Sequence, residues 1–217
     1  MMKRRFLGLW AAALSVAAAL AALAPHAHAA DEAPDALIRR LSEQTLAAIK
    51  ADPNLRSGDI NRVIALVDTR IMPNVNFHRM TAQAVGPAWR QATPEQRRRL
   101  QEEFKTLLVR TYSGALWQVS EETIVVRPLR ASPEDNEVLV RTEIRGRGEP
   151  IQLDYRLERT PGEGAGWKIF NLNVLGVWLV ETYRSQFAQE INAKGVDGLI
   201  ATLAERNRSN NARGGRN

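Results

Sequence analysis

The chain has 217 residues, a formal net charge of +6, three histidines and no cysteine. This length fits one domain or at most two small ones, and an apolar fraction of 44% is enough for a hydrophobic core. Because cysteine is absent, a thiol nucleophile, a thiolate metal site, a disulfide framework and a lipid-modified cysteine are all excluded.

Residues 1–29 have the pattern of a secretory signal peptide. Three basic residues precede an apolar run over 6–24, and Ala27-His28-Ala29 has the small-x-small form of a cleavage site. The run could almost span a bilayer as an anchor, but it is rich in alanine and no charged stop-transfer flank follows it. We therefore expect export, cleavage near Ala29 and a mature chain whose one histidine is His78.

The first part of the mature chain predicts three helices. Apolar residues recur with helical spacing over 35–50, and Asp52-Pro53-Asn54 ends that helix. A second helix should begin at a cap on Ser57 and end at Pro73, because capping side chains and prolines mark helix ends. A short third helix is expected over 77–85, before a glycine and a proline.

A capping box predicts the start of a longer helix. In Thr93-Pro94-Glu95-Gln96 the threonine can accept from the Gln96 amide, and the glutamine can reach back to the threonine N–H. Proline loses nothing at the first helical position. Apolar residues then recur on one side from Leu100 to Leu116, with the charged residues mostly elsewhere, so this helix should be amphipathic.

From about Thr123 the apolar period changes to two, which is typical of strands. Strands are predicted near 124–126, over 138–145, over 151–158 and over 167–175. Two of them have one apolar and one charged face. We therefore expect a four-stranded antiparallel sheet that helices cover on one face only.

The C-terminal part returns to helical spacing. A helix is predicted over 177–193, closed by Gly195, with a short final helix near 199–203. Residues 206–217 have no apolar anchor and predict a disordered basic tail. The whole is an α+β domain over 30–205, in which about six or seven helices wrap the sheet.

The net charge comes mainly from the two ends of the chain. Without residues 1–29 the chain has 27 Lys and Arg against 24 Asp and Glu, and the tail 206–217 contributes four arginines. The domain between them therefore has a net charge of −1. Basic residues on the helices and strands are interspersed with acidic ones, so we expect no nucleic-acid partner.

The mature chain has few side chains suited to catalysis. His78 has no second histidine with which to hold a metal and is interpreted as a surface or capping residue. Asp154 and Glu158 are interpreted as solvated charges on the outward strand face. The glycine-rich segment 162–166 lacks the helix and lysine of a phosphate loop and predicts a hairpin turn.

Short motifs occur in order from about residue 35 to 205. They are Val75-Asn76-Phe77-His78-Arg79-Met80, Trp89-Arg90-Gln91-Ala92-Thr93-Pro94-Glu95-Gln96, Leu107-Leu108-Val109-Arg110-Thr111-Tyr112, Asp154-Tyr155-Arg156-Leu157, Gly166-Trp167-Lys168-Ile169, Gly176-Val177, Tyr183-Arg184-Ser185-Gln186-Phe187 and Gly198-Leu199-Ile200. This ordered set resembles the toluene-tolerance, or MlaC, family of periplasmic phospholipid-binding proteins. The chain departs from the family pattern at Asn76 and Asn171, where Asp is common, and at Thr182, where Asn is frequent. Trp178 replaces a small Ser and would narrow a pocket that it faced.

The resemblance implies a periplasmic carrier that shuttles phospholipid between outer-membrane and inner-membrane complexes of an ABC-type transport system and so maintains lipid asymmetry. The implied partners are phospholipid, an inner-membrane ABC transporter complex and an outer-membrane lipoprotein complex, and the carrier is expected to be a monomer with no cofactor, metal or catalytic residue. It also implies an apolar pocket between sheet and helices, in a fold similar to that of nuclear transport factor 2. We expect the pocket to be lined by Val138, Val140, Ile144, Ile151, Leu153 and Tyr155 of the strands and by Leu107, Leu108, Tyr112, Trp178, Tyr183 and Phe187 of the helices.

Other interpretations stay open at this point. An enzyme of the ketosteroid isomerase kind would need a carboxylate inside the apolar pocket, whereas alternation places Glu143 and Asp154 on the outer face. A binding protein for polar solutes would need two α/β lobes, which the clustered strands disfavour. Each expected lining residue could also belong to a filled core, and a hopanoid could replace the phospholipid.

Overall fold

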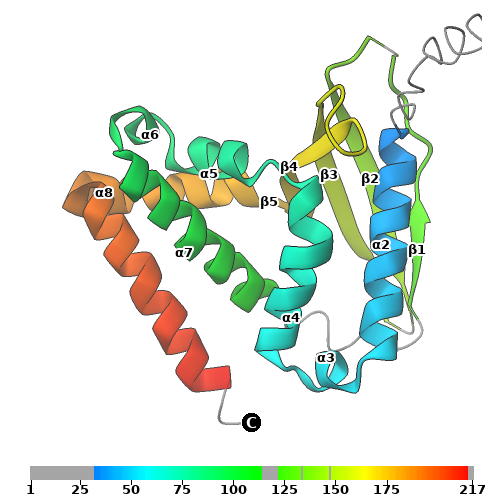
Figure 1. Cartoon of the computed structure of the whole chain (residues 1–217), viewed down its shortest axis with the longest axis horizontal. Coiled ribbons are helices and arrows are strands. Elements are labelled where there is room, and N and C mark those ends of the chain that lie inside the picture. Colours follow the sequence, from blue (N-terminus) through cyan, green and yellow to red (C-terminus); the bar gives the residue numbers. More distant parts are fainter. Residues whose placement is uncertain (1–31, 114–121, 133, 147, 215–217) are drawn as a thin grey trace, which may run out of the picture. The chain divides into compact units, whose positions relative to one another are not determined.

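The structure, a computed structural model, describes residues 32–113, 122–132, 134–146 and 148–214 (Figure 1). The predicted signal peptide over 1–29 lies outside these residues. The described part is an α+β arrangement of helices around one antiparallel sheet, as the sequence predicts.

Within the described ranges the sheet has five strands, not the four predicted. Each strand pairs antiparallel with its neighbour in sequence, so the order in space is the order in the chain. The additional strand has only two residues, which is too short for an alternating pattern to reveal. The strands are β1 (Thr123–Val126), β2 (Glu137–Arg145), β3 (Ile151–Arg159), β4 (Trp167–Val174) and β5 (Val177–Trp178).

The strand register gives the sheet two different faces. We call the face that carries the opposed pair Val140 and Tyr155 the inner face, and the face that carries Arg141 and Asp154 the outer face. The predicted alternation of apolar and charged side chains in β2 and β3 is confirmed by this register. The inner face includes Ile124, Val126, Val138, Val140, Thr142, Ile144, Ile151, Leu153, Tyr155, Leu157, Ile169, Leu172, Val174 and Val177.

The N-terminal helices cover part of the inner face. Leu37, Ile38 and Leu41 of the first described helix pack against Val138 and Val140 in one buried cluster. This packing explains the apolar stripe that the sequence shows over the same helix. The elements in this part are α2 (Pro34–Ala51), α3 (Pro53–Ser57), α4 (Ile60–Leu66), the π-helical turn η2 (Val67–Ile71) and the 3-10 turn η3 (Met72–Asn74).

The cap of α4 is Asp59, not Ser57 as predicted. The Asp59 carboxylate accepts from the backbone N–H groups of Asn61 and Arg62, whereas Ser57 is the last residue of α3. Gly58 separates the two helices in a left-handed conformation, with φ of 95°. The intervening glycine ends α3, and α4 therefore begins after Asp59 instead of after Ser57.

The remaining helices pack around a second hydrophobic cluster. The fully buried ring of Phe104 lies edge to face with Tyr183 at 5.0 Å and with Phe187 at 5.1 Å between ring centroids. Leu172 and Val174 of β4 pack against this cluster, which joins the helices to the sheet. These helices are α5 (Phe77–Val85), α6 (Ala88–Gln91), α7 (Pro94–Tyr112) and α8 (Leu179–Gly214).

The predicted capping box at the start of α7 is confirmed. The Gln96 N–H donates to Thr93 Oγ1 at 3.2 Å, and the Thr93 N–H donates to Gln96 Oε1 at 2.9 Å. The helix is described to Tyr112, so the expected end of its apolar stripe at Leu116 lies outside the described residues.

The last helix extends further than predicted. α8 is interrupted at Gly195, with φ of 70°, where the sequence places a helix end. Beyond it the chain is helical through 206–214, a segment predicted to be a disordered tail. The buried Asn207 donates from Nδ2 to the backbone oxygen and the carboxylate of Glu103, which attaches this segment to α7. The side-chain amide of Asn207 thus holds in place a segment that has no apolar anchor of its own.

Candidate functional site

The inner face of the sheet is covered unevenly. Where α2 crosses it, Val138, Val140 and Leu157 are buried together with Leu37 and Ile38. Because these side chains already contact one another closely, this part of the inner face is a filled core.

The other part of the inner face is only half-buried. It lies where β2 ends and β3 begins, and we call it the apolar strip. Its residues are neighbours across the strands, because Ile144 is opposite both Ile124 and Ile151, while Leu153 is opposite Val174. The strip consists of Ile124, Ile144, Ile151, Leu153 and Val174, all of intermediate exposure. Contiguous apolar side chains that the described part of the protein does not fully cover offer a surface to an apolar ligand.

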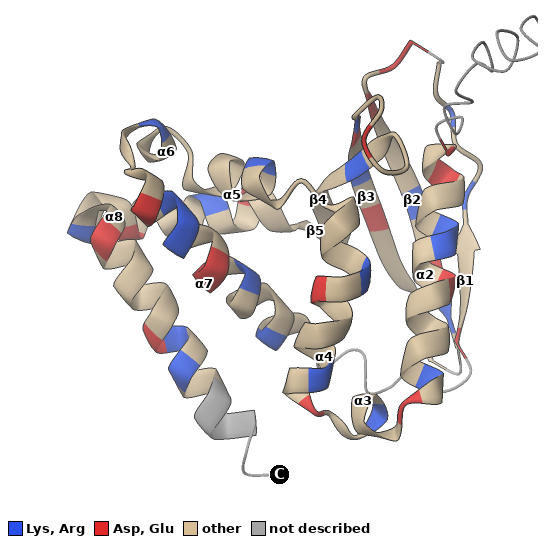
Figure 2. Cartoon of the chain, in the orientation of Figure 1, with Lys and Arg blue, Asp and Glu red and all other residues tan. Residues whose placement is uncertain are grey.

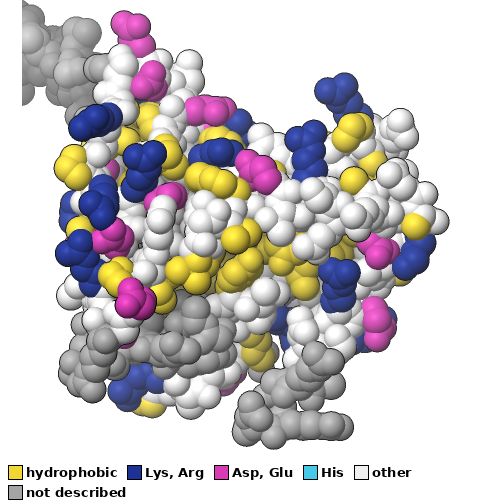
Figure 3. Space-filling view, turned by 180° about the vertical axis from the view of Figure 1, so that it is seen from behind, with side chains coloured by type: hydrophobic (Ala, Val, Ile, Leu, Met, Phe, Trp, Pro, Cys, Tyr) yellow, Lys and Arg dark blue, Asp and Glu magenta, His cyan; other side chains and the backbone are white. Residues whose placement is uncertain are grey.

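Half-buried side chains also occur on the helices next to the sheet. Leu108 and Tyr112 near the end of α7 pack against the second cluster and are only partly covered. Burial raises the pKa of the Tyr112 hydroxyl, so this group is uncharged at neutral pH. Figure 3, the view from behind, shows hydrophobic side chains gathered in a band across the middle of the molecule.

Tyr155 marks the boundary between the filled core and the apolar strip. Its ring is partly covered by the α2 cluster, while its hydroxyl is buried and hydrogen-bonds with Ser42 and Thr142. Burial raises the pKa of this hydroxyl, against the opposing effect of those hydrogen bonds. The group is therefore a neutral hydrogen-bonding partner rather than a charge beside the apolar strip.

The residues expected to line a pocket fall into three groups. Leu107, Val138, Val140, Tyr183 and Phe187 are buried in the two clusters, as a filled core would require. The half-buried group consists of Leu108, Tyr112, Ile144, Ile151, Leu153 and Tyr155. Trp178 forms a third group of its own. That these side chains bind lipid stays a prediction.

Trp178 lies elsewhere than the sequence analysis expects. It belongs to strand β5, not to a helix, and it is opposite Asn173, which is in turn opposite Asp154 on the outer face. The Arg156 guanidinium stacks over its ring, 4.1 Å from the centroid. The side chain is therefore on the other side of the sheet from the apolar strip. Ile124 and Val174, which were not among the expected lining residues, belong to the strip because alternation continues into β1 and β4.

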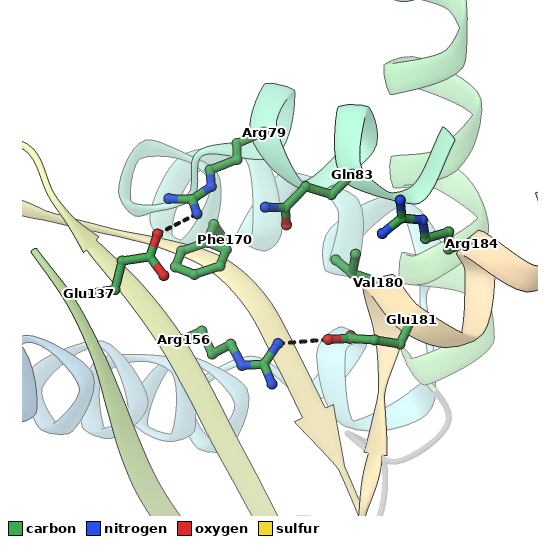
Figure 4. Close-up of a pocket in the computed structure, with 8 residues that line it drawn as sticks. All are labelled: Arg79, Gln83, Glu137, Arg156, Phe170, Val180, Glu181 and Arg184. Carbon is green, nitrogen blue, oxygen red and sulfur yellow. Dashed lines mark hydrogen bonds and ion pairs between the residues drawn. The ribbon is translucent and has the colours of Figure 1, made fainter. Parts of the chain in front are cut away.

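The outer face carries a polar cleft of about 300 Å³ between α5, the sheet and α8 (Figure 4). Most of its charges are paired, since Arg79 bonds both Glu137 and Glu158 and lies 3.7 Å from the ring centroid of Phe170. Across the cleft, Arg156 pairs with Glu181 at 2.6 Å. The lining residues are Arg79, Gln83, Glu137, Arg156, Phe170, Val180, Glu181 and Arg184. This cleft has the chemistry of an ionic link between helices and sheet rather than of an apolar site.

Contrary to the prediction, the two strand carboxylates are not exposed to solvent. Asp154 is only 5% exposed, and its Oδ2 accepts from Gln152 Nε2 at 2.7 Å. Its Oδ1 has no hydrogen-bond partner among the described atoms. Glu158 is partly buried between Arg79 and the side-chain amide of Asn76. A buried carboxylate therefore exists, but it lies on the outer face, away from the apolar strip.

Other candidate sites add little. His78 is exposed, and its ring meets the Trp89 ring edge-on at 5.2 Å between centroids. The described residues contain no cluster of three His, Asp or Glu side chains that could hold a metal ion. Within the same ranges, every helix is too short or too polar to cross a membrane. Figure 2 shows basic and acidic residues interspersed along α2, α7 and α8, as in the pairs of Arg98 with Glu95 and Glu102.

Comparison with known proteins gives consistent matches. The family described as MlaC protein matches residues 39–205. Toluene tolerance protein ttg2D of Pseudomonas putida is 31% identical over 150 residues, which are 68% of this chain and 65% of that protein. The intermembrane phospholipid transport system binding protein MlaC of Haemophilus influenzae is 22% identical over 177 residues, 81% of this chain and 83% of that protein. A solved structure of the phospholipid-binding protein from Ralstonia solanacearum, in complex with a phospholipid, has a TM-score of 0.77 and 45% identity, covering 81% of this chain and 97% of that one.

Proposed function

The chain belongs to the MlaC family, and from this premise we propose that it is a periplasmic phospholipid carrier. It takes up the acyl chains of a phospholipid against the apolar strip and the adjoining half-buried side chains of α7. The headgroup stays outside the apolar region, because burying an unpaired charge or polar group there would be costly.

The observation that carries this proposal is the apolar strip itself. A sheet face that helices cover completely at one end and only half at the other leaves apolar surface for a ligand. The relative from Ralstonia solanacearum, 45% identical, contains a phospholipid in its solved structure, which supports a lipid as that ligand.

The energetics suit a carrier that is not a catalyst. Burying an acyl chain is worth about 0.8 kcal/mol per CH₂, so two long tails represent roughly 20 kcal/mol of gross transfer free energy. The bilayer offers nearly the same burial, and exchange between membrane and protein is therefore close to neutral if the tails never cross water. Direction must then come from partners.

We propose that these partners are an inner-membrane ABC transporter complex and an outer-membrane lipoprotein complex, between which the carrier moves as a monomer. In this role it would help to maintain the lipid asymmetry of the outer membrane. A domain with a net charge near zero over 30–205 suits repeated docking and release, since it repels neither partner strongly.

Lipid extraction followed by mass spectrometry tests the proposal. We expect the purified protein to contain phospholipid near one molecule per chain, and the lipid-free protein to take phospholipid from vesicles. The variant Leu153→Asn places an amide in the middle of the apolar strip and should lower the amount of bound lipid several-fold. A protein that is purified empty and takes no lipid from vesicles would contradict the proposed function.

A further inference from the structure

The turn between β4 and β5 has two unfavourable features at once. Leu175 has a φ of 52°, and it is the one non-glycine residue with positive φ among those the structure describes. Its side chain is 65% exposed, and that of Val177 is 47% exposed. A left-handed backbone is normal at the tip of a two-residue hairpin, but a large apolar residue is uncommon in that conformation, and Asn or Gly is preferred there.

The hairpin does not need the Leu175 side chain. Leu175 and Gly176 both have positive φ, as in a type I′ turn, for which Asn-Gly is the preferred pair. The Leu175 N–H donates to the Gln152 oxygen at 3.0 Å, a backbone bond that any residue except proline could make. The Asn173 side chain also accepts from the Gly176 N–H at 2.8 Å. The turn is therefore held by other groups, and leucine adds only exposed apolar surface.

The hairpin tip continues the apolar strip to the surface. Leu153 is opposite Val174, and Val174 is opposite Val177, so the three form one row across the inner face. Exposure rises along this row, from intermediate at Leu153 and Val174 to exposed at Val177. Leu175, the most exposed of these apolar residues, follows Val174 directly in the chain at the turn. An apolar group moving along the row would stay in contact with apolar side chains throughout.

We infer that the β4–β5 hairpin tip, Leu175 and Val177, is the lip over which an acyl chain passes between a membrane and the apolar strip. This inference rests on the proposed function and adds the place of transfer. An acyl chain that crosses open water loses its contact with apolar surface, and that loss sets the barrier to exchange. An exposed leucine at the lip shortens the distance that the acyl chain must cross in water. This residue, although unfavourable in the turn, therefore speeds uptake without contributing to the stability of the bound state.

Leu175→Asn separates this role from a structural one. Asparagine tolerates the left-handed backbone and forms the preferred Asn-Gly turn, so we expect an unfolding midpoint equal to or above that of the unchanged protein. The variant loses the apolar contact at the lip. We expect its uptake of a fluorescent phosphatidylethanolamine, from vesicles of phosphatidylethanolamine and phosphatidylglycerol, to be about three- to tenfold slower. The amount bound at equilibrium should stay within twofold.

Leu139→Asn is the matched control. Leu139 is also exposed, at 37%, but it lies on the outer face opposite Arg156, apart from the apolar strip. We expect this variant to take up lipid at the unchanged rate. Unaltered uptake by Leu175→Asn, or equal slowing by both variants, would overturn the lip while leaving the carrier function intact. If the unchanged protein takes up no lipid at all, the proposed function fails first and the lip fails with it.

Discussion

At the residue scale, Trp178 shows how the strand register determines the face of the sheet on which a side chain lies. Its ring lies on the outer face beneath Arg156, so it should not limit the space for acyl chains. We predict that Trp178→Ser leaves the ratio of lipid to protein unchanged. The free energy of unfolding should fall by about 1–2 kcal/mol, because the cation–π contact and the partly buried ring are lost.

Mass spectrometry of extracted lipid and urea unfolding measure the two effects separately. Leu153→Asn serves as the reference for a change that does reach the apolar strip. A Trp178→Ser protein that binds additional or longer acyl chains would place the ring beside the lipid and contradict the register argument.

Asp154 shows what a single strand cannot tell. Its outward position was predictable from alternation in β3, and the register confirms that position. Its burial was not predictable, because its neighbours on the outer face come from other strands: Asn173 of β4 is opposite Asp154, and Trp178 of β5 is opposite Asn173. Local pattern therefore indicates the face of the sheet, while exposure on that face depends on tertiary neighbours.

At the scale of single elements, α7 depends on its cap. Thr93 and Gln96 satisfy two N-terminal donors reciprocally, and the helix carries the central ring of Phe104. We predict that Thr93→Ala lowers the free energy of unfolding by about 1 kcal/mol. Urea unfolding followed by circular dichroism measures this loss.

Thr106→Ala is the control within the same helix. The Thr106 hydroxyl donates to the Glu102 backbone oxygen at 2.9 Å in mid-helix, where alanine is the better helix former. We expect no loss of stability in this variant. Equal destabilisation by both substitutions would mean that the capping box makes no specific contribution to the free energy of unfolding.

Elements with strong local signals were predictable, and elements held by distant contacts were not. The capping box of α7 and the alternation of β2 and β3 act within a few residues, so the sequence alone located them. The two-residue strand β5 exists because a tight turn returns the chain to β4. The last turns of α8 are anchored by Asn207, whose partner Glu103 is more than one hundred positions earlier. Neither contact leaves a periodic pattern in the sequence.

At the scale of the whole molecule, the candidate site also has features that the local sequence predicts and features that depend on distant contacts. The inner face could be predicted from alternation, but its division into a filled core and an apolar strip depends on where α2 crosses the sheet. From the sequence alone, Val140 and Ile144 are equivalent, because alternation puts both on the same face of one strand. In the structure Val140 is buried under α2, while Ile144 in the apolar strip is only half-buried.

This division predicts that lipid stabilises the protein. A ligand that binds only the folded state adds RT ln(1 + [L]/Kd), or about 2.7 kcal/mol when the ligand is at one hundred times its Kd. We therefore expect the lipid-free protein to unfold at a lower temperature than the same protein reloaded with phosphatidylglycerol, as measured by thermal unfolding. Glycerophosphoglycerol, the headgroup without acyl chains, is the control and should not raise the midpoint, because the apolar strip recognises hydrocarbon. Equal stabilisation by the headgroup alone, or none by the intact lipid, would show that the apolar strip is not where the lipid binds.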